Sequence, residues 1–127
     1  MKTKDLFGAI RKDYDQGDVT NSLTQSILNF IRLRGGAAFR INTNGIPIVI
    51  NGTFRGWRKS TNPGAADIRA IINGYSVDIE VKSDTDKLNP NQVNFKRQVE
   101  DAKGQYWEVR RFEDFYNFYN YFISSFK

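Results

Sequence analysis

Hydrophobic residues recur every three or four positions in three segments of the chain, and polar turn-forming residues separate these segments. This spacing places the apolar side chains on one side of a helix. It predicts a short helix over residues 4–15, a second from about residue 22 to 34, and a C-terminal helix over 112–127. Ser22 and Gln25 resemble a capping box that would start the second helix.

A fourth helix, over residues 90–102, is predicted from the residues at its two ends. Asn89 is suited to the N-cap, and Pro90 is favoured at the first helical position because the N–H it lacks would be unpaired there. Lys103-Gly104 would end the helix. Gln92 stands at the third position, where it forms a capping box with Asn89.

Alternating or continuous apolar residues between turn signals predict five strands. These strands span 37–43, 46–51, 66–72, 75–82 and 105–111. The first two are expected to pair with each other, and Asn73-Gly74 joins the third and fourth in a tight hairpin turn. Residues 52–64 are rich in glycine and basic residues and lack periodicity, so they are predicted to form a loop.

The order of these elements predicts an α/β or α+β sandwich, in which helices flank a mixed sheet. The length of 127 residues favours one domain, 1–127, with a core at about 20–111 and an aromatic helix over 112–127. No apolar run approaches the roughly 20 residues that cross a bilayer, so no membrane contact is expected. The N-terminus lacks the apolar stretch of a signal peptide, which indicates an intracellular, cytoplasmic protein.

The sequence contains neither cysteine nor histidine, and this narrows the available chemistry. Disulfides, thiol nucleophiles, imidazole bases and zinc sites built from these residues are excluded. Catalysis would rest on carboxylates, lysine, hydroxyls and an oxygen-ligated hard cation such as Mg²⁺. The net charge of +5 and the pI of about 9.6 favour an anionic partner, with nucleic acid first.

The predicted strand 75–82 carries Asp78, Glu80 and Lys82 on one face, because residues two apart in a strand share a face. The hairpin geometry can bring Asp67 near Glu80. Two neighbouring carboxylates raise each other's pKa unless a cation lies between them, and Mg²⁺ accepts such ligands. With Lys82 alongside, these groups suit metal-assisted phosphodiester hydrolysis. The alternative is a solvated face of an amphipathic strand.

Residues 64–95, GAADIRAIINGYSVDIEVKSDTDKLNPNQVNF, resemble the PD-(D/E)xK nuclease core, and specifically the VRR-NUC family. The similarity covers roughly Ser22 to Arg110 and includes Arg40 on the preceding predicted strand. The positions that match the family pattern are Gly64, Asp67, Ile68, Ile79, Glu80, Lys82, Pro90 and Gln92.

The resemblance implies a restriction-endonuclease-like fold and a DNA endonuclease that depends on Mg²⁺ or Mn²⁺. Asp67, Glu80 and the backbone carbonyl of Val81 would bind the metal, Lys82 would be the catalytic lysine, and Gln92 would support the site. Stand-alone VRR-NUC proteins look like phage or mobile-element homodimers that act on branched DNA. The resemblance therefore implies a homodimer that is selective for branched or junction DNA.

The sequence departs from the family at the first core helix, where the family usually has a glutamate that adds a metal ligand. The segment DVTNSLTQS offers no glutamate. Either Gln25 or Asp18 substitutes, or the residue has changed and the metal site has fewer ligands. A second interpretation is therefore a catalytically weak or inactive nucleic-acid-binding protein on a nuclease scaffold. A third is an interaction module that binds no nucleic acid.

Residues predicted to bind DNA lie mainly in the basic segment 52–64. Basic side chains neutralise phosphates, and aromatic side chains stack on unpaired bases. The candidates are Arg55, Trp57, Arg58 and Lys59, with Lys87 on the other side of the site. The alternative is a solvated loop that a tryptophan anchors.

The C-terminal helix carries more aromatic residues than one stripe needs. At about 100° per residue, Phe118 and Tyr121 lie off its main face. Either the core contacts this helix over a wide arc, or the additional aromatic residues form a homodimer interface.

Overall fold

The computed structural model describes residues 16–41, 46–58 and 62–126, and the helix predicted over residues 4–15 lies outside these ranges. In chain order, the helices and strands are α2 (Gln16–Leu33), β1 (Ala37–Arg40), β2 (Ile46–Ile50), β3 (Thr53–Arg58), β4 (Ile68–Ile72), β5 (Tyr75–Val81), α3 (Pro90–Asp101), β6 (Gln105–Val109) and α4 (Phe112–Ser124).

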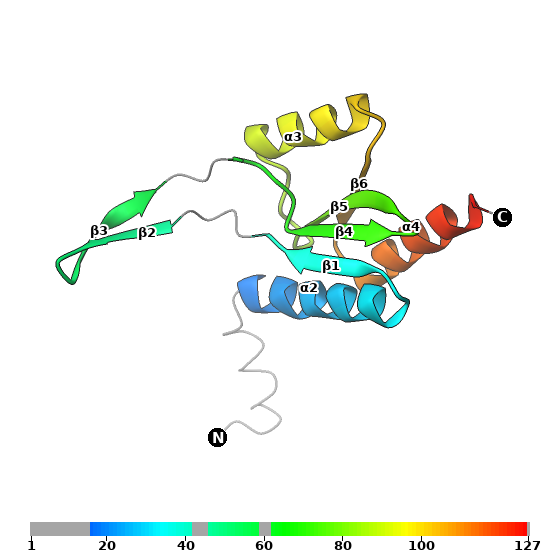
Figure 1. Ribbon diagram of the computed structural model, residues 1–127, viewed down its shortest axis with the longest axis horizontal. Helices are drawn as coiled ribbons and strands as arrows, with labels where there is room; N and C mark the ends of the chain where they lie inside the picture. The colour runs from blue at the N-terminus through cyan, green and yellow to red at the C-terminus, as the bar shows by residue number, and fades with distance from the viewer. Residues whose placement is uncertain (1–15, 42–45, 59–61, 127) are drawn as a thin grey trace, which may run out of the picture.

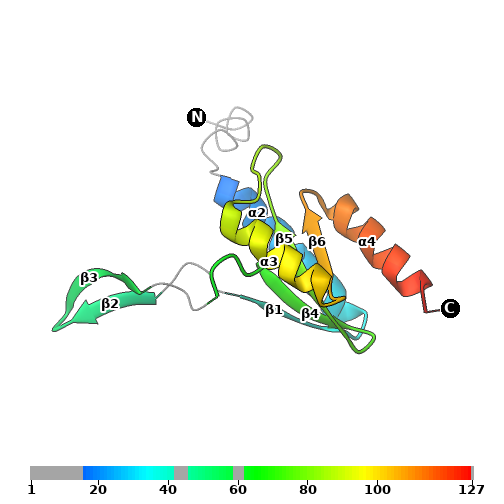
Figure 2. The ribbon, with the colours of Figure 1, turned by 90° about the horizontal axis from the view of Figure 1, so that it is seen from above.

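Four strands form the main sheet, in the order β1-β4-β5-β6. Strand β4 pairs antiparallel with both β1 and β5, whereas β6 runs parallel to β5. Helix α3 lies on one face of this sheet, and α2 and α4 lie on the other, as Figures 1 and 2 show. The protein is therefore a mixed α/β structure with helices on both faces of a mixed sheet, which confirms the architecture predicted at this level of detail.

The face of the sheet toward α2 and α4 carries the hydrophobic core. Ile79 of β5 lies between Ile68 of β4 and Trp107 of β6 in the sheet register, and all three are buried. Helix α2 contributes Ile27 and Ile31 to the same cluster. Because side chains alternate along a strand, the polar residues between these positions in β5 face α3 instead.

Helix α4 packs its aromatic residues over a wide arc. The ring of Phe30 in α2 makes edge-to-face contacts with four aromatic residues of α4, which are Phe112, Phe115, Tyr116 and Tyr119. Phe118 stacks on Trp107, with ring centroids 5.6 Å apart. Contacts with the core thus account for Phe118, whereas the side chain of Tyr121 is 80% exposed.

The second and third strands form a separate hairpin, and two predictions are wrong here. The segment predicted as a loop contains β3, which pairs with β2, and β1 pairs with β4 rather than with β2. Asn51 and Gly52 both adopt positive φ, at 50° and 77°, as a tight hairpin turn requires. A register shift at Ile48/Val49 and the glycine-rich, basic sequence of β3 hide the strand periodicity.

Helix α2 begins earlier than predicted, at Gln16 rather than near Ser22. Ser22 and Gln25 are therefore helix-interior residues, and the capping box predicted for them is wrong. The hydroxyl of Thr24 donates to the carbonyl of Thr20 at 2.7 Å, one turn back, so this polar stretch continues the helix. The capping box predicted for Asn89 and Gln92 at the start of α3 is confirmed.

Candidate active site

The pairing of β4 with β5 brings two carboxylates to the same end of the sheet. Ile68 lies opposite Ile79, so Asp67, just before β4, lies opposite Glu80 on the face toward α3. The Oδ2 atom of Asp67 accepts a hydrogen bond from the backbone N–H of Val81 at 2.8 Å. Asp67 is thereby held beside Glu80 and beside the peptide segment that carries the Val81 carbonyl.

Glu80 is the most confined charged group in this region. Its side chain is 3% exposed, and its Oε2 atom accepts a hydrogen bond from Gln92 Nε2 at 3.1 Å. The Nζ atom of Lys82 lies 3.8 Å from the same oxygen. The other oxygen, Oε1, is buried and makes no hydrogen bond with any residue that the structure describes.

The electrostatic surroundings disfavour an ionised Glu80. Burial and the nearby Asp67 raise the pKa of Glu80 to about 8, and the charge of Lys82 opposes this rise only in part. A buried carboxylate with an unpartnered oxygen is normally satisfied by a donor or a cation. A proton shared with Asp67, or a cation bound between the two acids, would satisfy this oxygen.

Gln92 joins the start of α3 to this carboxylate. Its Oε1 atom accepts from the backbone N–H of Asn89 at 2.9 Å, while its Nε2 atom donates to Glu80. One side chain thus completes the helix cap and donates a hydrogen bond to an acid, so the capping contact and the contact with the site occur together.

The loop before Asp67 packs closely on the same helix start. Gly64 has a φ of +83°, and a Cβ atom there would lie 2.3 Å from the carbonyl oxygen of Asn91. Only glycine allows this approach. The contact positions the segment that leads into Asp67 against the turn that carries Gln92.

The arrangement of oxygen ligands fits a hard divalent cation such as Mg²⁺. Asp67 and Glu80 converge, and the unpartnered Glu80 oxygen lacks the positive partner that such an ion would supply. A third carboxylate is not present: across the residues that the structure describes, no three Asp, Glu, His or Cys side chains gather as metal ligands. The pair accounts for two ligands, and water or substrate oxygens would complete the shell.

Helix α2 supplies no carboxylate to this pair from its described side chains. Gln25 is exposed and donates to Asn29 Oδ1 at 3.0 Å along the surface of the helix. The side chain of Asp18 lies outside what the structure describes. Near this end of the sheet, Asn21 accepts a hydrogen bond from the guanidinium of Arg40, so an amide occupies this part of the helix.

A tyrosine beside the two acids was missed by sequence reasoning. Tyr106 pairs with Asp78 in the register and lies under α3, where its ring contacts Phe95 and Lys96. Its hydroxyl is buried and has no partner among the described residues. Burial, followed by the charge of Glu80, raises the pKa of Tyr106, so this residue stays neutral. The sequence signal for this placement was the alternation of side chains along β6, which puts Tyr106 and Trp107 on opposite faces of the sheet.

The residues predicted to bind DNA do not gather around the acids. Arg55, Trp57 and Arg58 are exposed on β3, and the hairpin projects away from the main sheet (Figures 1 and 2). Lys87 is exposed on the connection between β5 and α3. Lys59 lies outside the described residues.

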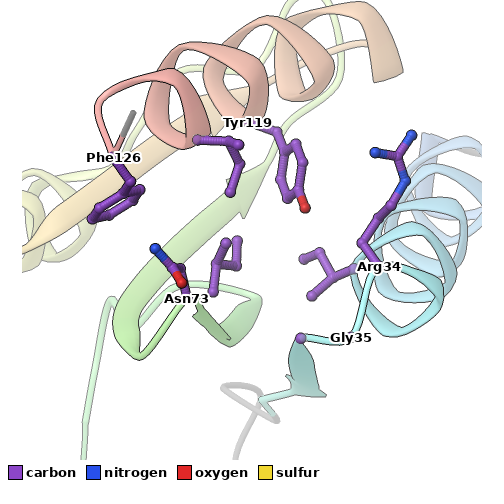
Figure 3. A pocket seen from close by; sticks show the side chains of 9 residues that line it. Arg34, Gly35, Asn73, Tyr119 and Phe126 are labelled. Carbon is purple, nitrogen blue, oxygen red and sulfur yellow. The ribbon is translucent and has the colours of Figure 1, made fainter.

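A pocket of about 430 Å³ lies at the opposite end of the sheet, beside the β4–β5 turn. Figure 3 shows its lining, which includes Arg34, Asn73, Tyr119 and Phe126. None of the lining residues is acidic, and the pocket is separate from Asp67 and Glu80. It therefore contributes nothing to the candidate site.

Comparisons with known proteins leave the fold and the site geometry as the basis for a functional proposal. The sequence matches no protein-family model and no curated protein. Among the described helices, none has both the length and the apolar character that crossing a bilayer requires.

Proposed function

We propose that this protein is a Mg²⁺- or Mn²⁺-dependent endonuclease that hydrolyses DNA phosphodiester bonds on a restriction-endonuclease-like core. One observation carries the proposal: a buried carboxylate, Glu80, has an unpartnered oxygen beside a second acid and within reach of Lys82. The resemblance to the VRR-NUC family assigns these same residues to catalysis. It also supports selectivity for branched or junction DNA and a phage-encoded protein that acts in the bacterial cytoplasm.

Asp67, Glu80 and the Val81 carbonyl would hold the metal ion, which when bound polarises the phosphate and makes water a stronger nucleophile. Lys82 is 14% exposed, so its ammonium faces the site rather than bulk solvent. There it stabilises the negative charge that develops as a water oxygen attacks phosphorus. The phosphorus–oxygen bond to the leaving group then breaks, which leaves one phosphate monoester and one hydroxyl.

Gln92 and Gly64 hold Glu80 and Asp67 in position. Gln92 keeps Glu80 in one orientation through its amide donor, and the contact of Gly64 with α3 keeps the Asp67 segment in place. A preorganised pair of acids avoids the cost of ordering them during the reaction.

Cleavage assays with Mn²⁺ on linear, nicked, flapped and four-way DNA test the proposal. We expect Lys82→Ala to reduce cleavage at least 100-fold, which corresponds to about 3 kcal/mol of transition-state stabilisation. Arg34→Ala is the matched control, because it removes one positive charge at the other end of the sheet. Failure of the wild-type protein to cut any of these substrates would falsify the proposal.

A second candidate function is favoured by the missing third carboxylate. Because Gln25 lies on the outer surface of α2, the side chains that the structure describes supply two acidic ligands where the family usually has three. A nucleic-acid-binding protein with weak or no catalysis is consistent with this. Salt-sensitive DNA binding without cleavage in Mg²⁺ or Mn²⁺ would support it in place of the nuclease.

A further inference from the structure

The β2–β3 hairpin is an arm that projects away from the main sheet (Figures 1 and 2). Within residues 16–41, 46–58 and 62–126, its two strands contact each other and no other helix or strand. An isolated two-stranded hairpin is only marginally stable in water. Because this hairpin exposes apolar side chains, it is suited to binding a partner that covers them.

One face of this arm is an aromatic platform. The register places Trp57 opposite Pro47 and Phe54 opposite Val49, so these four side chains share a face. Phe54 and Trp57 are 54% and 62% exposed, and their rings meet edge to face with centroids 5.6 Å apart. Two adjacent, solvent-facing rings can each stack with a flat group.

All the charge on the arm is positive. Arg55 and Arg58 are exposed on β3, and residues 46–58 contain no aspartate or glutamate. A symmetric contact between the arms of two copies would bring these arginines together without an acid on either arm to compensate, which is costly. The charge is complementary to a polyanion, and the exposed rings are complementary to bases that are not already stacked in a duplex.

The base of the arm lies at the candidate active site. The chain leaves β1 for the arm and returns from it to β4, and these two segments are hydrogen-bonded where Ile41 N–H donates to the Asp67 carbonyl at 2.7 Å. The arm is therefore inserted into the chain next to Asp67.

We propose that the β2–β3 arm binds an unpaired nucleic-acid strand, with bases stacked on Phe54 and Trp57 and phosphates paired with Arg55 and Arg58. This inference rests on the proposed function and names its substrate class: DNA with an unpaired segment beside the cut, such as a flap or bubble. Fully paired duplexes and fully paired four-way junctions present no free base faces to the arm.

Binding is measured without catalysis, by fluorescence anisotropy of a labelled thymidine oligonucleotide of about 10 nucleotides in EDTA. We expect the double variant F54A/W57A to weaken binding ten-fold or more, because each stacked base contributes strongly to such complexes. Trp57→Phe keeps an aromatic ring and should bind within about three-fold of wild type. Tyr75→Ala, which removes an exposed ring at the end of β5 away from the arm, is the matched control and should bind as wild type does.

The ligand also has a matched control. An abasic oligonucleotide of the same length keeps the phosphates and lacks the bases, so we expect it to bind wild type about as weakly as the thymidine strand binds the double variant. The sequence has two tryptophans, and Trp107 is buried, so fluorescence quenching on binding reports on Trp57. We expect Trp57→Phe to abolish that quenching.

Several results would overturn the inference. These are equal binding of the abasic and normal strands, equal binding of duplex and single strand, or unchanged binding by the double variant. If the double variant instead converts a dimer to a monomer, the partner of the arm is a second copy. Binding of the single strand without cleavage of DNA would overturn only the proposed nuclease activity. Equal cleavage of flap and duplex DNA by wild type and by the double variant would overturn only the proposed role of the arm.

Discussion

Glu80 is the residue at which burial and charge conflict most strongly. Below its ordinary pKa of 4.5 the carboxyl group is protonated in both the folded and the unfolded chain. Between pH 4.5 and about 8, the folded protein retains a proton that the unfolded chain has released. The stability of the metal-free protein should therefore fall as pH rises through this window, because the folded state binds more protons.

This conflict sets up a test with a single substitution. In EDTA at pH 9, we expect Glu80→Gln to stabilise the protein by several kcal/mol, since the rise in pKa from 4.5 to about 8, at about 1.4 kcal/mol per pKa unit, sets an upper limit of about 5 kcal/mol. At pH 4 the two proteins should be equally stable. Urea unfolding at both pH values measures the difference. A destabilised variant at pH 9 would show that ionised Glu80 is already compensated without a metal ion.

Gln92 makes two contacts that can be separated by substitution. Gln92→Ala removes both, and we expect a loss of about 1–2 kcal/mol in unfolding free energy and at least ten-fold in cleavage. Gln92→Glu keeps an acceptor for the Asn89 N–H but lacks the amide donor to Glu80. It should keep the cap while losing cleavage, as thermal unfolding and DNA assays would reveal. Full activity in Gln92→Glu would mean that the glutamine serves the helix alone.

At the scale of elements, the junction between the Asp67 loop and α3 positions the acids. We expect Gly64→Ala to destabilise the protein by about 2–4 kcal/mol, through a backbone clash and an unfavourable φ. Gly35→Ala is the matched control: its φ is +88°, and no atom lies within 4 Å of an added Cβ. It should cost only about 1 kcal/mol. Equal losses in urea unfolding would show that the Asn91 contact is not what constrains Gly64.

Elements whose ends carry strong local signals were predicted well. Asn73-Gly74 predicted the β4–β5 turn, and Asn89-Pro90 predicted the start of α3, because each pair favours one backbone geometry. The end of α2 before Gly35 was also predicted, whereas its start was not, because the polar residues before Ser22 were read as a turn and are helical. The partners of β1 and β2 were not predicted either, because strand pairing depends on contacts that local sequence does not specify.

The meeting of Asp67 with Glu80 could be anticipated from the hairpin alone, because the turn determines the register. The burial of Glu80 could not, since it depends on α3 covering that face of the sheet. Tyr106 was missed for the same reason: it reaches the site through a parallel pairing of β6 with β5, which a long crossover connects.

At the scale of the whole molecule, the exposed aromatic surface of α4 offers the proposed homodimer interface, with Tyr121 as its most exposed ring. Sedimentation equilibrium should show a dimer that Tyr121→Ala weakens ten-fold or more, as expected for a central tyrosine. Trp57→Ala is the control, because it removes an exposed ring from the separate hairpin. A monomer at all concentrations would contradict the dimer and leave the catalytic proposal intact.

The hydrogen bond between Ile41 and Asp67 marks a junction at which insertions can change such a protein. The chain departs and returns at adjacent points, so the main sheet would close just as well around a short turn in place of the arm. In the proposed nuclease, cutting chemistry and substrate choice would then reside in separable modules. Insertions of other lengths and compositions at this single junction could redirect the same acids to new DNA structures without rebuilding the sheet that holds them.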